Sequence, residues 1–323
     1  MYRNRIVFIV VFIIAILVGV YCIIDLFGQQ ALNRLYSPTK RVSLEKGYKE
    51  NIQKTIFVHN PKEPEIRIAI APIMSPEKSL PLYRNLINYI GKAVTMQPFL
   101  MQKSSYSEVN DLLHYDSCDI GFVCSYPYVL GEREYGLKLL AVPRINGKIT
   151  MQSYIIVPAA SKAQSLLDLR GKRFASCDII SQTGWIYPAL WLLNHGEKPK
   201  EFFADHIICG SHDRALRAVA EHFADGAAVQ SLVYEKMIKE DPSLADKVRI
   251  IMISAPCGAA PIVANPRMPA VLREKIRSAL ITMHESSEGR AILRQMGIER
   301  YEVPEDSLYD SVRHDAELWN PRS

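Results

Sequence analysis

The sequence lacks the short motifs that identify many nucleotide-binding, metal-dependent and hydrolytic enzymes. Across its 323 residues there is no P-loop, no Gly-x-Gly-x-x-Gly run, no His-Glu-x-x-His pair and no EF-hand spacing, the patterns that place backbone amides or side chains around phosphates and metal ions. A Gly-x-Ser-x-Gly nucleophile elbow is also absent. An enzyme of this sequence would therefore need a catalytic arrangement outside these common motifs.

Cysteine spacing gives no indication of a metal site. The six cysteines form no Cys-x-x-Cys pair and no cluster with histidine at zinc-like intervals, so we expect neither a bound metal nor another cofactor. All but Cys22 follow residue 28, which leaves an odd number there and at least one unpaired thiol. Cys177 and Cys209 each end a predicted strand, and either a disulfide or two buried thiols would fit that placement.

Basic charge is not concentrated in any one stretch. Lys and Arg total 39 against 34 Asp and Glu, and the excess of +5 is spread along the chain. This distribution lacks the basic patch or stripe expected of a nucleic-acid-binding protein. With 48% hydrophobic residues, a chain of this length can bury a sizeable core and form more than one compact lobe.

Residues 6–24 form one charge-free apolar run, long enough to cross the roughly 30 Å hydrocarbon layer as a helix. Arg3 and Arg5 precede the run and Asp25 follows it, so the positive-inside rule places the N-terminus in the cytoplasm. A cleaved signal peptide is the alternative, but the run is longer than usual and no small-residue cleavage site follows it. We expect a single-pass inner-membrane anchor and a periplasmic or otherwise extracytoplasmic bulk.

After a cytoplasmic tip and anchor (1–28) and a polar, proline-bearing linker (29–64), strand and helix patterns alternate. Buried-strand patterns at 66–72 and 118–125 enclose a helical pattern at 81–94 and further elements. Such alternation is typical of an α/β lobe with a mostly parallel sheet.

The alternation then happens a second time. Strand patterns at 172–176, 205–210 and 226–230 are separated by helical patterns at 184–196 and 212–223. Two such units predict two α/β lobes. We expect the first part of lobe 1 over 65–155, lobe 2 over 156–250, and a return to lobe 1 with C-terminal helices over 251–323.

Polar residues cluster where strands of the second unit end and helices begin. Ser181, Gln182 and Thr183 follow one strand, and Gly184 opens a helix. Ligands bind outside the carboxyl ends of strands in open α/β sheets, and a helix N-terminus attracts anions. The alternative is that Ser181 or Thr183 is only a helix cap. His212 lies at the next such junction, where it would donate to an anion, most strongly if charged, or be only a surface or capping residue.

Two tyrosines, Tyr106 and Tyr126, follow strands of the first unit and would close a cavity from the opposite side, unless they serve packing alone. His212 with Ser181 or Cys177 is the only triad-like set in the chain. Without a nucleophile elbow or metal set, we expect a binding protein and not an enzyme.

Seven strings occur in an order that resembles one known family: SPEKS, SYSEV, CDIGFVCSYPYVL, LLDLRGKRFASCD, SQTGW, GSHDRALRAV and GAAVQSLVYE. Over about residues 65–285 the chain is similar to the phosphate/phosphite/phosphonate ABC-transporter substrate-binding proteins. The resemblance implies a type II periplasmic-binding-protein fold, a two-strand hinge and ligand capture by closure. The retained anchor departs from family members that are released or held by lipid.

The resemblance also implies a set of ligand contacts. Hydroxyls of Ser181 and Thr183, the amide of Gly184 and the His212 ring match the family's second-lobe contacts, while Tyr106 and Tyr126 match first-lobe tyrosines. Members that bind aminophosphonates place acidic groups where this chain has Gln230 and Ser231, which argues against an amine-bearing ligand.

The leading hypothesis is therefore capture of a small phosphate-, phosphite- or phosphonate-type oxyanion for an ABC permease. Two alternatives stay open. In the first, the same binding module presents its closed form to a membrane sensor for signalling. In the second, the fold carries an enzyme, but the extracytoplasmic anchor and the lack of a catalytic set argue against it.

Overall fold

The computed structural model describes residues 64–319. The expected membrane helix at 6–24 and the linker up to residue 63 lie outside these residues. Among the helices between Pro64 and Trp319, none is long and apolar enough to cross a membrane.

Lobe 1 is built on a six-stranded sheet in the order β13-β4-β12-β3-β1-β2. β1 pairs in parallel with β2 and β3, whereas β12 and β13 pair antiparallel with their neighbours. The expectation of a mostly parallel sheet is wrong, because these two strands come back from the other lobe and run the opposite way. The strands are β1 Glu65–Ile70, β2 Gln97–Gln102, β3 Ile120–Phe122, β4 Lys138–Arg144, β12 Ile262–Ala264 and β13 Arg300–Glu302.

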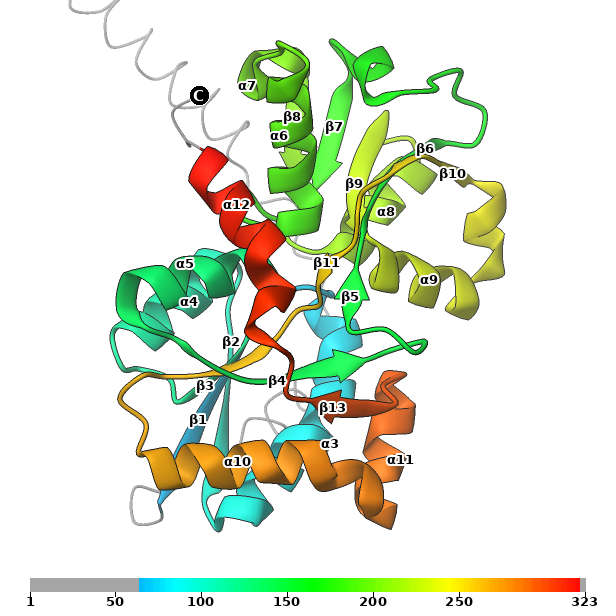
Figure 1. Ribbon diagram of the computed structural model, residues 1–323. Coiled ribbons are helices and arrows are strands. Elements are labelled where there is room, and N and C mark those ends of the chain that lie inside the picture. Colours follow the sequence, from blue (N-terminus) through cyan, green and yellow to red (C-terminus); the bar gives the residue numbers. More distant parts are fainter. Residues whose placement is uncertain (1–63, 320–323) are drawn as a thin grey trace, which may run out of the picture. The chain divides into compact units, whose positions relative to one another are not determined.

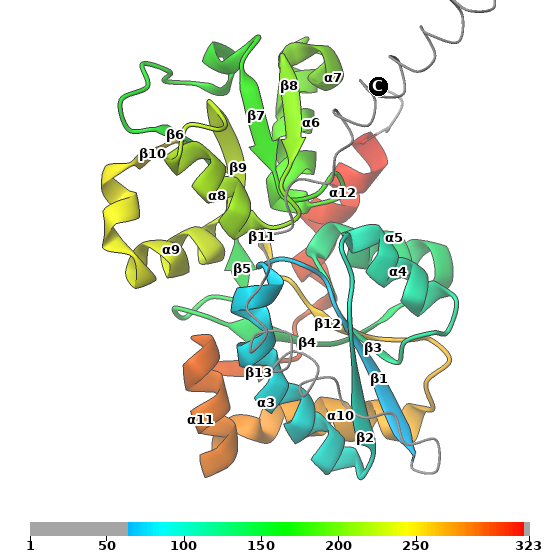
Figure 2. The same cartoon turned by 180° about the vertical axis from the view of Figure 1, so that it is seen from behind.

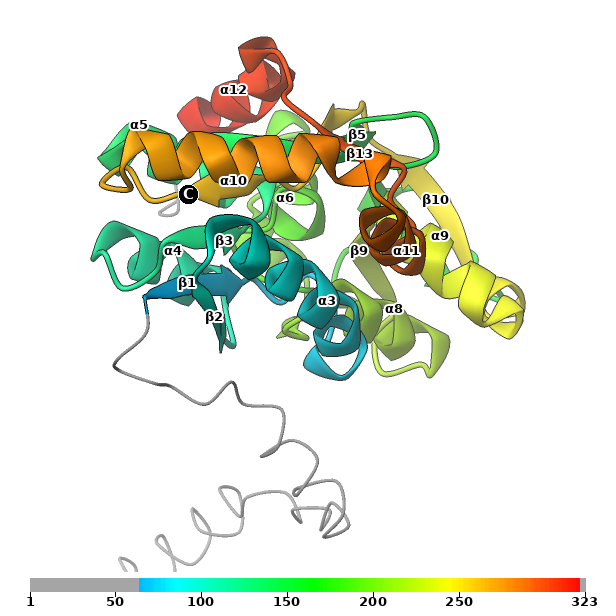
Figure 3. The same ribbon diagram turned by 90° about the horizontal axis from the view of Figure 1, so that it is seen from below.

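Helices α3, α10 and α11 cover lobe 1, as seen from below in Figure 3, and α10 contacts α3, β4 and β13. α12 contacts both α5 of this lobe and α6 of the other. The helices are α3 Pro76–Val94, α4 Tyr106–His114, α5 Ser125–Tyr135, α10 Ala270–Thr282, α11 Ser287–Met296 and α12 Asp310–Leu318.

Lobe 2 has a five-stranded sheet in the order β10-β6-β9-β7-β8 (Figure 1). β7 runs parallel to β8 and β9, and β6 runs antiparallel to β9 and β10. The strands are β6 Ser153–Pro158, β7 Arg173–Ser176, β8 Asp205–Ile208, β9 Gly226–Gln230 and β10 Val248–Ile253. The helices are α6 Tyr187–Asn194, α7 Pro199–Phe202, α8 His212–Ala220 and α9 Ser231–Glu240.

The chain crosses between the lobes at a small two-stranded sheet. β5 (Thr150–Met151) pairs antiparallel with β11 (Cys257–Gly258), and Figures 1 and 2 show this pair between the two larger sheets. The two crossings between the lobes are therefore extended and lie side by side.

One hydrophobic cluster extends through both lobes. It includes Tyr106 and Leu113 of lobe 1 together with Phe174, Trp185 and Leu190 of lobe 2, all less than 10% exposed. Burial of apolar surface at this scale holds elements together. The lobes therefore pack against each other in a closed arrangement, and the residues at their junction are shielded from water.

Candidate functional site

The turn after β7 folds tightly around a serine and a glycine. Ser181 is completely buried and its Oγ accepts a hydrogen bond from Gly184 N at 3.1 Å. A side chain at position 184 would place its Cβ 2.6 Å from Cys177 Sγ, so the turn requires glycine there. Ser181 does act as the cap of the π-helical turn Gln182–Ile186 that leads into α6. Its capping role does not exclude a role in binding, because a serine hydroxyl can donate one hydrogen bond while it accepts others.

His212, the first residue of α8, is completely buried beside this turn. Its Nδ1 accepts from the backbone N–H of Gln230 at 3.1 Å, which places the proton of the neutral ring on Nε2. Nε2 lies 3.3 Å from Cys177 Sγ and 3.4 Å from Ser181 Oγ. The structure therefore brings His212 and Ser181 together, and the surface alternative for His212 is wrong.

Burial keeps this cluster uncharged. Desolvation lowers the pKa of His212 to about 3, and the nearby Asp213 carboxylate offsets only part of that effect. Desolvation also raises the pKa of the Cys177 thiol. In the closed arrangement His212 is thus a neutral N–H donor and not the charged donor considered from the sequence.

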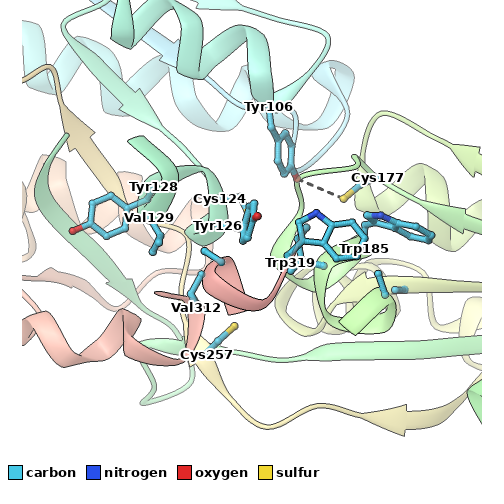
Figure 4. Packing of buried hydrophobic residues seen from close by; sticks show 14 of the residues in the cluster. Tyr106, Cys124, Tyr126, Tyr128, Val129, Cys177, Trp185, Cys257, Val312 and Trp319 are labelled. Carbon is cyan, nitrogen blue, oxygen red and sulfur yellow. Dashed lines mark hydrogen bonds between the residues drawn. The ribbon is translucent and has the colours of Figure 1, made fainter. Parts of the chain in front are cut away.

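Tyr106, the first residue of α4, reaches this cluster from lobe 1. Its hydroxyl donates to Cys177 Sγ at 3.7 Å (Figure 4), and its backbone N–H donates to Asp178 Oδ2 at 2.9 Å. Tyr126 of α5 belongs to the hydrophobic cluster that extends through both lobes and is 3% exposed, and desolvation raises the pKa of its hydroxyl to about 12. Both tyrosines predicted from the sequence therefore lie at the junction of the lobes.

Three buried hydroxyls at helix starts have no hydrogen-bond partner within residues 64–319: Ser125 Oγ, Thr183 Oγ1 and Ser211 Oγ. Ser125 opens α5 in lobe 1, Thr183 lies in the turn before α6, and Ser211 is the N-cap of α8. Buried polar groups are nearly always paired. Unpaired hydroxyls at three helix N-termini are a feature that a bound ligand would explain.

The side chains of Gln230 and Ser231 point to other partners. Gln230 Nε2 donates to Met151 Sδ at 2.7 Å, and Ser231 Oγ accepts from Gln152 N at 3.0 Å. Only the backbone amide of Gln230 touches the cluster, through His212. These two residues thus border the site, whereas the six others predicted from the sequence lie in or beside the buried cluster.

Cys177 was not among the ligand contacts predicted from the sequence, although it lies where Tyr106, Ser181 and His212 converge. Its only sequence signal was its place at a strand end beside the polar turn. The alternative of a disulfide with Cys209 is not realised, since both are free thiols. The sequence also did not predict that the Asp178 carboxylate would accept from Tyr106 N of the other lobe.

One cavity of the described residues adjoins the candidate site, whereas a larger groove lies away from it. The cavity of about 510 Å³ lies between the lobes beside α9, and its lining includes Ile73, Phe122, Gln230 and Lys236. It is next to the cluster, because His212 N donates to Ile73 O and Gln230 N donates to the His212 ring. The larger groove of about 830 Å³ between α3, α11 and β2 contains none of the candidate residues.

Known proteins resemble this chain in sequence and in structure. The family described as "ABC transporter, phosphonate, periplasmic substrate-binding protein" matches residues 68–309. The phosphate-import protein PhnD of Mycolicibacterium smegmatis is 24% identical over 274 residues, which are 77% of this chain and 84% of the relative.

Solved structures share the fold. The binding-protein component of an ABC phosphonate transporter from Pseudomonas aeruginosa has a TM-score of 0.74 at 17% identity, covering 79% of this chain and 86% of its own. PhnD1 from Prochlorococcus marinus, in complex with methylphosphonate, has a TM-score of 0.70 at 16% identity, covering 80% and 98%. The two-lobed periplasmic-binding-protein fold implied by the resemblance is confirmed. Because the family match extends over about three quarters of its length, this chain belongs to the periplasmic substrate-binding proteins of phosphonate ABC transporters.

Proposed function

We propose that this chain captures a small phosphorus oxyanion of the phosphate, phosphite or phosphonate class between its lobes and delivers it to an ABC permease. The observation that carries the proposal is the set of unpaired buried hydroxyls of Ser125, Thr183 and Ser211 at helix starts in both lobes. Helix N-termini favour negative charge. A tetrahedral anion with several oxygens would satisfy these donors together and favour the closed state.

Within this proposal, neutral donors hold the anion. The hydroxyls of Ser125, Thr183 and Ser211 donate to its oxygens. His212 Nε2–H and the hydroxyls of Ser181 and Tyr106 also donate, while Tyr126 closes the apolar side. Gly184 has a supporting role, because its amide already donates to Ser181 Oγ. Gln230 orients the His212 ring through its backbone amide, and Ser231 lines the wall behind it.

The site is proposed to bind without chemistry. A nucleophilic cysteine needs a lowered pKa, yet burial raises that of Cys177. In a catalytic triad the second nitrogen of the histidine donates to an orienting carboxylate, whereas Nδ1 of His212 accepts from the Gln230 amide. The cluster therefore lacks the polarity of a Cys–His or Ser–His catalytic pair.

We also propose that residues 6–24 tether the molecule to the inner membrane as one helix, with the two-lobed part outside the cytoplasm and close to its permease. The lobes are proposed to follow the division expected from the sequence, 65–155 with 251–323 and 156–250, except that the strand ends at 153–155 and 251–253 belong to the lobe 2 sheet. The lobes are proposed to pivot at β5 and β11. Ligands would enter when the lobes separate, because Ser181 and His212 are completely buried in the closed arrangement.

Thermal unfolding of the full-length chain against a ligand panel tests this function. Phosphate, phosphite, methylphosphonate and 2-aminoethylphosphonate would be compared with sulfate and with unrelated organic acids. A ligand that binds only the folded state raises the melting temperature by mass action. We expect shifts confined to phosphorus oxyanions, with the weakest for the amine-bearing ligand; a folded protein that shifts with none of them would contradict the proposal.

A further inference from the structure

Two buried aspartates of lobe 2 each accept a hydrogen bond from the start of a lobe 1 helix. Asp178 Oδ2 accepts from the backbone N–H of Tyr106 at 2.9 Å, where α4 begins. Asp213 Oδ1 accepts from the backbone N–H of Ser75 at 2.8 Å, at the N-cap of α3. The two aspartates are only 5% and 2% exposed. Both bonds cross from one lobe to the other.

We propose that Asp178 and Asp213 are positioning residues that together hold the lobes closed around the bound anion. The inference rests on the proposed function for the identity of the ligand. Neither residue is assigned to touch the ligand itself, and each acts through the lobe 1 helix that it caps.

The first reason is their place in the chain. Asp178 directly follows Cys177 and Asp213 directly follows His212, and Cys177 and His212 are in contact inside the cluster. A ligand that fixes this cluster also fixes the two backbone segments that carry the aspartates. Ligand binding and the two bonds between the lobes are therefore mechanically linked.

The second reason is that the helix starts lack these partners within their own lobe. In α4 the Ser105 hydroxyl accepts from Glu108 N, which leaves the first amide, that of Tyr106, for Asp178. In α3 the N-cap Ser75 makes no side-chain capping bond. A carboxylate at a helix N-terminus is stabilised by the helix dipole. Lobe 2 thus adds a carboxylate acceptor to the capping box of α4 and to the start of α3, where Ser75 makes no side-chain cap.

The third reason is that the ion pairs between the lobes near these helix starts are exposed to solvent. The Arg214–Glu77 pair spans 3.3 Å with side chains about half exposed, and the Lys78–Glu240 pair is also partly exposed. Exposed ion pairs contribute little, whereas a buried charged acceptor bound to an amide contributes more. The two aspartate bonds are thus shielded from water, unlike these ion pairs, and they lie beside a backbone bond from His212 N to Ile73 O that also joins the lobes.

Hydrogen–deuterium exchange on the full-length chain in detergent, without ligand and with saturating methylphosphonate, tests the pair. Asp178→Ala removes the bond between the lobes to Tyr106 N and a local bond from Ile180 N, and Asp213→Ala removes the bond to Ser75 N. If the aspartates hold the lobes together, each single variant accelerates exchange at both amides, because opening frees both. We also expect each variant to raise the Kd for methylphosphonate about tenfold, mainly through faster dissociation.

Glu77→Ala is the matched control: it removes the exposed pair with Arg214 and should leave exchange and affinity nearly unchanged. If each aspartate variant affects only its own partner amide, the aspartates are local caps and the inference is wrong. A double variant carries both Asp178→Ala and Asp213→Ala. The inference is also wrong if the Tyr106 and Ser75 amides of the wild-type chain exchange as fast as those of the double variant, both with and without methylphosphonate. The single variants could accelerate exchange at both amides without ligand while the wild-type chain binds no phosphorus oxyanion. That result would contradict the proposed function but support closure by Asp178 and Asp213.

Discussion

Cys177 Sγ lies 3.3 Å from His212 Nε2, at the centre of the donors that we assign to the anion. Sulfur is a weak hydrogen-bond donor and acceptor. A ligand group facing Cys177 would therefore be favoured if it is apolar, such as the methyl group of methylphosphonate, over the fourth oxygen of phosphate. The thiol would then be a source of selectivity inside a cluster of otherwise oxygen and nitrogen donors.

Cys177→Ser is expected to reduce the preference for methylphosphonate over phosphate about tenfold, because an oxygen donor replaces sulfur at the same position. Isothermal titration with both ligands measures the ratio of the two Kd values. Cys118→Ser is the matched control, since Cys118 is equally buried but donates to Ile120 O inside lobe 1. An unchanged ratio in Cys177→Ser would place this residue away from the ligand.

Loss of single donors should weaken binding while the fold persists. Ser181→Ala removes a proposed ligand donor and also the acceptor for Gly184 N, so we expect about 1 kcal/mol lower stability, as for the loss of a helix cap, together with weaker oxyanion binding. His212→Ala should weaken binding as well, because it removes Nε2–H. Titration calorimetry and circular dichroism separate the two effects. Equal affinity in both variants and the wild-type chain would remove this site assignment.

The sequence predicted the strands and helices that are marked by the spacing of their apolar residues and by turn residues at their ends. The strand at 66–72 and the helix at 212–223 correspond closely to β1 and α8. α3 begins at Pro76, earlier than the predicted residue 81, because Pro81 lies inside the helix. α5 was missed, since Pro127 and the two residues either side of it resemble a strand end more than a helix. The antiparallel direction of β12 and β13 depends on the path of the chain after it returns from lobe 2. No local sequence pattern contains that information.

For the site, local signals indicated Ser181 and His212 because both follow a strand and begin a helix. They could not show that Gln230 N fixes the ring of His212, or that Asp213 reaches Ser75, 138 residues away. Nor could they assign charge, since the pKa of His212 depends on burial created by both lobes. The sequence thus predicted which polar residues lie at the site. Their hydrogen-bond partners and their charge states depend on the tertiary structure.

The free state of the thiols gives a direct prediction. Alkylation of the native chain without reductant should modify Cys209 first, because it is the only partly exposed cysteine within residues 64–319. Cys177 should react only when the lobes open, and a bound oxyanion should slow it further. After denaturation without reductant, peptide mapping should find both sites alkylated. A pair that resists alkylation until reductant is added would reveal a disulfide and contradict the structure.

Acid should destabilise the protein partly through His212. Its folded pKa of about 3 lies below the ordinary value of about 6.5, so the unfolded chain binds the proton more readily. The stability that depends on the neutral ring is complete above about pH 6.5 and is lost as the pH falls towards 3. Between pH 7 and pH 5 this loss amounts to about 2 kcal/mol.

His212→Gln is the variant that isolates this effect, because it keeps a polar side chain but removes the titrating group. Denaturant titrations at several pH values should show a shallower loss of unfolding free energy between pH 7 and pH 5 than in the wild-type chain. His206, whose pKa burial lowers to about 4, is present in both proteins and contributes equally to each curve. Parallel curves would mean that the ring is already solvated or charged in the folded protein, and that the closed arrangement around Cys177 and Ser181 does not shield it.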